Sequence, residues 1–199
     1  MTFRTMTFRI MTFRTTIFRK VTFNSTTLQS VLASFILLAV SAAAQTPANS
    51  ELKKLDYFSG TWVTDATVQP GPWGAGGKFT STSINQWKPD GSALICQRKY
   101  SMPAEIGGDG SATVTMSYDP ASHSYAATET NSQRGTIVSK GTLTGDTWTW
   151  TSTANYNGMD IQQELTLKPI SDTSYTLKFE TSVDGTNWLT FMEGKVTRK

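Results

Sequence analysis

Short β-rich segments follow one another from Gly60 to the end of the 199-residue chain, and turn signals separate them. The connections contain Asn-Gly, Asp-Gly and Gly-Asp pairs, which tolerate the positive φ angles that tight hairpins require. A meander of roughly ten strands hides its exposed edges best by closing on itself. The sequence therefore predicts an all-β fold, a single antiparallel up-and-down β-barrel. The expected strands cover residues 60–68, 77–88, 92–101, 111–118, 123–130, 134–143, 146–154, 160–169, 174–182 and 187–198.

Apolar and polar residues alternate within these segments and so indicate which way each side chain points. Trp148 and Trp150 share one face of their strand, against neighbouring threonines, and Leu165 and Leu167 lie opposite Glu164. Because successive side chains of a strand point to opposite faces, one face is apolar and aromatic and the other is rich in threonine and charge. This pattern predicts a water-soluble barrel with a polar exterior, whereas an outer-membrane barrel would be apolar outside.

The segment before the first strand is the one place where a helix is expected. Over residues 50–58, Leu52, Leu55 and Phe58 line one face of a short helix. Gly60 then lets the backbone turn closely into the first strand. Trp62, two residues on, is expected to point inward and to plug that end of the barrel with its large apolar ring.

A Gly-x-Trp motif that follows a short helical segment and opens an antiparallel barrel resembles the calycin group, which includes lipocalins, fatty-acid-binding proteins and nitrobindin-like barrels. More closely, most of residues 50–199 resembles a bacterial family catalogued only as a domain of unknown function. The motifs that carry this resemblance are Leu55-x-x-Phe58-x-Gly60-Thr61-Trp62, the loop Pro70-Gly71-Pro72-Trp73, Tyr118-Asp119-Pro120 and Trp148-Thr149-Trp150.

The resemblance implies a lipocalin-like fold and brings no known activity. Nitrobindin-like barrels hold haem through a histidine near the end of the chain, and residues 187–199 contain no histidine. Haem ligation is therefore not supported, and no cofactor is expected.

The N-terminal 44 residues have the three-part pattern of a secretory signal. Basic residues come first, the apolar run 31–40 follows, and Ala42-Ala43-Ala44 satisfies the small-x-small rule for cleavage. Cleavage after Ala44 would leave residues 45–199 as one exported barrel domain, in the periplasm or outside the cell. An uncleaved anchor is the alternative, and otherwise contact with the membrane is expected only through this segment during export.

Residues 1–25 repeat with a period of five, as in MTFRT-MTFRI-MTFRT. This period gathers no apolar face in a helix or a strand, so it indicates a low-complexity extension of the signal or a true start further on, at Met11. Five of the 18 basic residues and none of the 15 acidic ones precede residue 45, so the rest of the chain carries a formal charge of −2. No nucleic-acid partner is expected, because phosphate binding needs a basic face.

The sequence contains few of the residues from which catalytic and metal sites are usually built. Cys96 is the single cysteine and is expected to be a small apolar residue in a strand. His123 is the single histidine and is expected at an exposed hairpin tip. With one residue of each kind, neither a zinc site of ordinary composition nor a nucleophile with a histidine base is expected, so we name no catalytic or metal-binding residue.

Arg98 shares its phase with Cys96 and Tyr100, so the pattern places a charge inside the barrel. A buried arginine needs a partner, either an internal carboxylate or an anionic ligand. The alternative is that Arg98 packs over an aromatic ring such as Trp62, or reaches out to the rim. Arg198, on the last strand, is a rival for the stacking position over Trp62.

The loop at 69–77 is too long for a tight hairpin, and loops of that kind are often functional. Two prolines stiffen its start, glycines loosen the rest, and Trp73 is a large apolar ring with no strand to hold it. If Trp62 plugs one end, this loop lies at the other, where Trp73 would be a lid over the mouth. The alternative is that Trp73 caps a filled core.

The leading hypothesis is a non-enzymatic, exported, lipocalin-like barrel that binds a small apolar or amphipathic molecule. Two alternatives stay open: an enzyme of the isomerase or cyclase type that uses the same cavity, and a solid barrel that serves as a structural or interaction module. The identity of the ligand and the oligomeric state stay open too. The candidate ligand-binding residues are Trp73, Trp87, Arg98, Tyr100, Trp148, Trp150, Tyr175 and Phe179.

Overall fold

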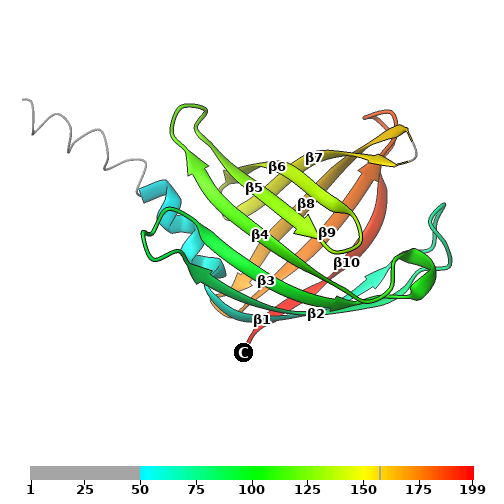
Figure 1. The fold of residues 1–199 in the computed structure, drawn as a ribbon, viewed down its shortest axis with the longest axis horizontal. Coiled ribbons are helices and arrows are strands. Elements are labelled where there is room, and N and C mark those ends of the chain that lie inside the picture. Colours follow the sequence, from blue (N-terminus) through cyan, green and yellow to red (C-terminus); the bar gives the residue numbers. More distant parts are fainter. Residues whose placement is uncertain (1–49, 157) are drawn as a thin grey trace, which may run out of the picture. The chain divides into compact units, whose positions relative to one another are not determined.

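The computed structural model describes residues 50–156 and 158–199, which form a closed antiparallel barrel (Figure 1). The strands follow one another around the sheet in chain order, and β1 pairs with β10 to close it. A short helical segment that ends in the 3-10 helix η1 (Lys54–Phe58) precedes β1, and η2 (Ala104–Ile106) lies between β3 and β4. The strands are β1 (Gly60–Val68), β2 (Gly77–Trp87), β3 (Leu94–Ser101), β4 (Gly110–Asp119), β5 (Ser124–Asn131), β6 (Gly135–Thr144), β7 (Thr147–Tyr156), β8 (Met159–Ser171), β9 (Ser174–Ser182) and β10 (Leu189–Arg198).

This architecture confirms the expected all-β barrel of about ten strands with one short N-terminal helix. The small differences in strand ends have local causes. β3 begins at Leu94 because the chain first turns through Gly91, whose amide donates to the Lys88 carbonyl at 2.9 Å. β10 begins at Leu189 because the Asp184 carboxylate, through its Oδ1 atom, accepts the amides of Thr186 and Asn187 and holds the preceding loop.

The helix end of the barrel, where η1 lies, is filled by Trp62. This indole is completely buried, and its Nε1 donates to the Phe58 carbonyl at 2.8 Å. Gly60 adopts a φ of +101°, a conformation that favours glycine, and so allows the sharp entry into β1. The Arg198 guanidinium lies over the Trp62 ring at 4.6 Å and donates to the Tyr57 carbonyl at 2.7 Å. Of the two arginines that the sequence leaves open for this stacking position, Arg198 occupies it.

The rest of the helix end is an aromatic core. Trp148 packs edge to face against Phe58 and Tyr125, with ring centroids 5.3 and 4.7 Å apart. Trp150 stacks on Trp148 in the next inward position, at 6.3 Å. Gly141 on the neighbouring strand makes room for the Trp150 ring, because a Cβ there would lie 2.6 Å from it. Packing of this density ties the helix to the barrel.

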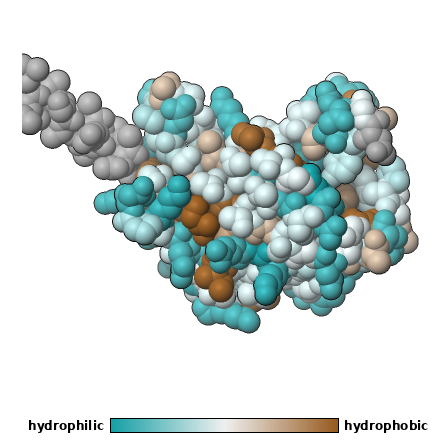
Figure 2. All heavy atoms as spheres, in the orientation of Figure 1, coloured by the Kyte–Doolittle hydropathy of each residue, from teal (hydrophilic) through white to brown (hydrophobic). Residues whose placement is uncertain are grey.

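The exterior is mainly polar, as Figure 2 shows for one face, where hydrophobic residues form small separate patches. His123 is exposed in the turn between β4 and β5 and has a φ of +49°. No helix among the described residues is long and apolar enough to cross a bilayer. The expected signal segment and its cleavage site at Ala44 lie outside the described residues.

Candidate functional site

A cavity of about 250 Å³ lies inside the barrel, and each strand contributes at least one side chain to its wall. It extends from Phe58, under the Trp62 plug, to side chains near the opposite end of the strands, such as Met102 and Arg134. That volume is just below the range of roughly 300–1,000 Å³ found for small-molecule sites. The barrel is therefore only partly filled by its own side chains.

One wall of the cavity is polar and comes from β2. Ser81, Ser83 and Asn85 occupy alternate positions on this strand, point inward and are all at least nine-tenths buried. Ile84, between them, points outward and is 47% exposed. Over this part of β2 the inward face is as polar as the outward face. Burying polar side chains is unfavourable unless they find partners, so this wall needs hydrogen-bonding partners inside the barrel.

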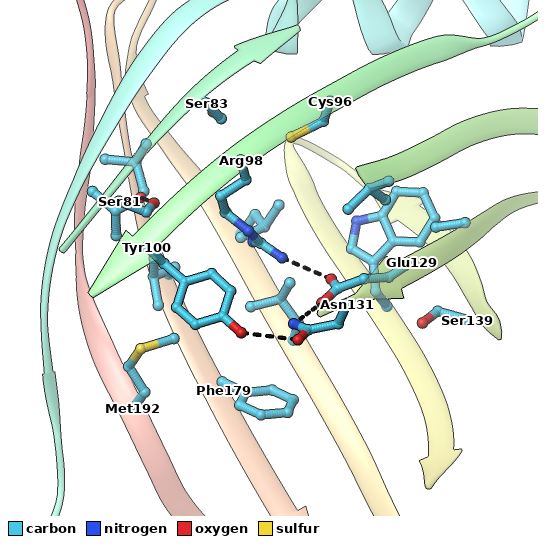
Figure 3. Close-up of a pocket in the computed structure, with 18 of the residues that line it drawn as sticks. Ser81, Ser83, Cys96, Arg98, Tyr100, Glu129, Asn131, Ser139, Phe179 and Met192 are labelled. Atoms are coloured by element: carbon cyan, nitrogen blue, oxygen red, sulfur yellow. Dashed lines mark hydrogen bonds and ion pairs between the residues drawn. The ribbon is translucent and has the colours of Figure 1, made fainter. Parts of the chain in front are cut away.

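An ion pair lies on the cavity wall and reaches over β4. The Arg98 Nη2 atom is 2.7 Å from the Glu129 Oε2 atom, so a guanidinium from β3 meets a carboxylate from β5 (Figure 3). The other carboxylate oxygen accepts from the Asn131 amide at 3.0 Å. Asn131 in turn accepts the Tyr100 hydroxyl at 2.8 Å. This network fixes the carboxylate in position.

The electrostatics of the site follow from these neighbours. Burial opposes the charge on Arg98, but the Glu129 carboxylate outweighs it and raises the pKa of Arg98, so the guanidinium stays charged. Burial raises the pKa of Cys96, so this thiol stays protonated and is a poor nucleophile. Burial also raises the pKa of Tyr175, chiefly because its ring lies deep in the barrel, so its hydroxyl remains a hydrogen-bond donor.

Two polar atoms of the cavity wall, the Asn85 Oδ1 atom and the Arg98 Nε atom, have no hydrogen-bond partner within the described part of the chain. Both are buried. The described residues contain no group of three or more His, Cys, Asp or Glu side chains that could hold a metal ion. Arg134 also lines the cavity, with its guanidinium 5.9 Å from the Phe191 ring centroid, and it forms no ion pair with a described carboxylate. The described side chains therefore offer hydrogen bonds, apolar contact, one neutralised ion pair and one further cation.

The structure separates the sequence candidates into two groups. Those whose side chains line the cavity are Arg98, Tyr100, Trp150, Tyr175 and Phe179. Those that pack elsewhere are Trp73, Trp87 and Trp148. Trp148 belongs to the aromatic core of the helix end, and Trp87 donates its Nε1 to Asp56 there at 2.8 Å.

Trp73 lies behind the cavity wall. Its Nε1 donates to the Gln69 carbonyl at 2.6 Å, and its ring packs edge to face on Phe191, with the centroids 5.0 Å apart. Phe191 itself lines the cavity. An effect of Trp73 on a bound molecule would therefore pass through Phe191.

Glu129, Asn131 and the polar wall of β2 are the residues that sequence reasoning missed. Glu129 shares the inward phase of Tyr125 and Ala127, and this phase would have placed its carboxylate inside the barrel. For β2 the signal was weaker, because serine and threonine alternate there and hydropathy does not distinguish the two faces.

A closed antiparallel barrel, plugged by a tryptophan under a short helix and hollow inside, is a lipocalin-like barrel. The chain belongs to the family described as "Protein of unknown function (DUF1579)", which matches residues 47–198.

A solved structure with a similar fold is described as "Crystal Structure of Rv2717c from M. tuberculosis". It is 12% identical, has a TM-score of 0.51, and the match covers 74% of this chain and 96% of the other. This likeness concerns the fold alone. A search of curated proteins found no match.

Proposed function

We propose that this protein is an exported binding protein that takes up a small amphipathic molecule inside its barrel. The cavity of about 250 Å³ is the observation that carries this proposal. Protein interiors are normally packed as densely as organic crystals. Voids created in packed cores are destabilising, by about 24 cal/mol per Å³, so sequences rarely keep one without a use. A barrel with a purely structural role gains nothing from such a space.

The chemistry of the wall supports an amphipathic ligand. Near the end opposite the helix, the lining side chains include Phe79, Phe179 and Phe191, which offer apolar contact. Nearer the plug, the wall includes Asn85 and Arg98, which offer hydrogen bonds. Small-molecule sites commonly combine a mainly apolar lining with a few placed polar groups.

The test is titration of the protein with straight-chain amphiphiles, followed by calorimetry and by tryptophan emission. Trp150 lines the cavity, so saturable binding is expected to change the emission. Ala127→Phe, which places a ring in the cavity, is expected to abolish binding. Thr128→Phe is the matched control, because Thr128 is the next residue on β5 and its side chain is exposed and outside the cavity. Absence of saturable binding to the unmodified protein would contradict the proposal, and turnover of a bound probe would favour an enzyme instead.

Export rests on the signal pattern that ends at Ala44. N-terminal sequencing of the protein recovered from its source is expected to find Gln45 as the first residue. A chain that still carries residues 31–44 would indicate an anchor.

A further inference from the structure

The part of the cavity next to the plug contains an acceptor that the protein leaves unpaired. Asn85 is 5% exposed, and its Nδ2 atom donates to the Phe58 carbonyl at 2.7 Å. This bond fixes the amide with its Oδ1 atom unpartnered, and Asn85 lines the cavity. Buried polar side chains nearly always have a partner, so the partner of this acceptor comes from outside the fold, either a water in the cavity or a ligand group that takes the place of that water.

A donor in the same wall is also unpaired. The Arg98 Nε atom is buried without a partner, while Nη2 holds Glu129. Arg198 has an unpaired Nε atom as well, but the Trp62 ring lies against its guanidinium at 4.6 Å and accounts for its environment. No aromatic ring takes this place beside Arg98 among the described residues.

The strand register brings the acceptor and the donor together. Asn85 pairs with Cys96, and Ser83 pairs with Arg98, so Asn85 and Arg98 are diagonal neighbours on the inward face of β2 and β3. The backbone positions of diagonal neighbours lie about 7–8 Å apart, within reach of long side chains, so the polar atoms of Asn85 and Arg98 face the same part of the cavity. Tyr175 also lines the cavity, and its hydroxyl lies close enough to Cys96 and Arg98 to interact with them electrostatically. We call Asn85, Arg98 and Tyr175 the polar floor.

Charge decides which polar group the floor can accept. Glu129 already neutralises Arg98 at 2.7 Å, and Asn131 holds that carboxylate in place. A ligand carboxylate bound to Arg98 would therefore lie close to a second negative charge, and like charges in a buried site are unfavourable. It would also face the Asn85 oxygen without a proton to donate. A neutral group with both a donor and an acceptor meets neither obstacle.

We propose that the polar floor binds a neutral, hydrogen-bonding head group, an alcohol or a primary amide. The O–H or N–H of this group donates a hydrogen bond to the Asn85 Oδ1 atom, and its oxygen accepts one from the Arg98 Nε atom. The apolar chain then points away from the plug. In Figure 3, Ser83 and Cys96 lie on the helix side of Arg98, and Tyr100, Phe179 and Met192 lie on the other side, where the chain would pass. The inference rests on the proposed function and specifies the ligand class for the same cavity.

The first experiment compares head groups on one chain length. The protein is titrated near pH 7.5 with 1-octanol, octanamide, heptyl methyl ether and octanoate. The alcohol and the amide are expected to bind about tenfold more tightly than octanoate. The ether accepts but does not donate, so it is expected to bind roughly fivefold more weakly than the alcohol, the effect of about one hydrogen bond.

Two isosteric or near-isosteric variants sharpen the test. Glu129→Gln removes the competing negative charge and leaves Arg98 unneutralised, so it is expected to raise the affinity for octanoate relative to octanol by about tenfold. Tyr175→Phe removes only a hydroxyl, and weaker binding of octanol with unchanged binding of octane would place that hydroxyl in the floor.

Asn85→Leu is expected to remove the preference for the alcohol over the ether. Because Asn85 also holds the Phe58 carbonyl, near-UV circular dichroism must show a native fold before this variant is interpreted. Gln86→Leu is the matched control, since its side chain lies on the exposed face of the same strand. It is expected to leave every ratio of affinities unchanged.

The outcomes distinguish the two proposals. If no octyl compound binds saturably, the proposed function fails, and the head-group site fails with it. If all the compounds bind equally, or octanoate binds most tightly to the unmodified protein, the polar floor is wrong and the binding function stands. Retention of the alcohol preference in a folded Asn85→Leu variant would also overturn the assignment.

Discussion

Two arginines point into the same barrel and have different surroundings. Arg198 lies at the helix end, with its guanidinium over the Trp62 ring, and donates to the Tyr57 carbonyl. Arg98 lies in the cavity wall and is neutralised by Glu129. Arg198 contributes to packing, since the Trp62 ring and the Tyr57 carbonyl both interact with its guanidinium. Arg98 belongs to a polar network that faces open space. The comparison separates a part of the barrel that is complete from a part that is not.

The largest effect is expected from a change in the helix end of the barrel, where packing is complete. Trp62→Ala deletes a fully buried indole, the hydrogen bond to Phe58 and the surface on which Arg198 lies. Deletion of a buried aromatic ring costs about 3–5 kcal/mol, and urea unfolding is expected to show a loss in this range. An unfolding free energy equal to that of the unmodified protein would contradict the role of Trp62 as the plug.

A double-mutant cycle on Arg98 and Glu129 tests the other side of the comparison. Breaking a fully buried pair costs about 3–5 kcal/mol, but these side chains are roughly a quarter exposed (28% and 27%), so Arg98→Met is expected to cost about 2 kcal/mol. Adding Glu129→Gln is expected to recover most of the loss, because no unpaired charge is left. If the two changes are simply additive in urea unfolding, the ion pair contributes no coupling.

Arg198→Met provides the contrast with Arg98→Met. It loses a cation–π contact and a hydrogen bond to a backbone carbonyl, together about 1–2 kcal/mol. None of the described carboxylates forms an ion pair with Arg198, so removal of Glu129 is expected to leave this loss unchanged. Rescue of Arg198→Met by Glu129→Gln would mean that the two arginines share one network.

Trp73→Ala distinguishes a gate from a packed cap. Trp73 does not line the cavity but packs on Phe191, which does, and its ring is partly buried. As a gate, it is expected to speed the release of a bound probe several-fold with a loss of about 1 kcal/mol in stability or less. Stopped-flow release of octanol and urea unfolding measure the two effects. A loss of stability without a change in release would indicate a cap.

The turns and the alternation of residues were enough to predict the strands, because both signals are local. Depth along the barrel axis was not predictable in the same way. Trp148 and Trp150 share one phase, yet only Trp150 reaches the cavity, because the residues of η1 fill the space beside Trp148. Alternation of apolar and polar residues predicts which face of the sheet a side chain is on, but not its position along the barrel axis.

The partner of Arg98 was also beyond local signals. The sequence leaves an internal carboxylate and a ligand anion as alternatives, and Glu129 comes from a strand that does not pair with β3. Curvature of the closed sheet brings them within 2.7 Å. A contact between next-but-one strands depends on the side chains of the strand between them, here β4, and on how much of the interior is left unfilled.

The smallest expected effect concerns His123, which lies in an exposed turn and belongs neither to the helix end nor to the cavity wall. Its side chain is exposed at a hairpin turn, and its φ of +49° lies in the left-handed region, which histidine adopts more readily than most non-glycine residues. His123→Ala is therefore expected to change the unfolding free energy by less than about 0.5 kcal/mol. His123→Gly relieves the strain of this conformation and is expected to be neutral or slightly stabilising, by up to about 1 kcal/mol. Urea unfolding measures both variants, and a loss above 1 kcal/mol for alanine would mean that this turn supports the barrel in a way that its exposure does not suggest.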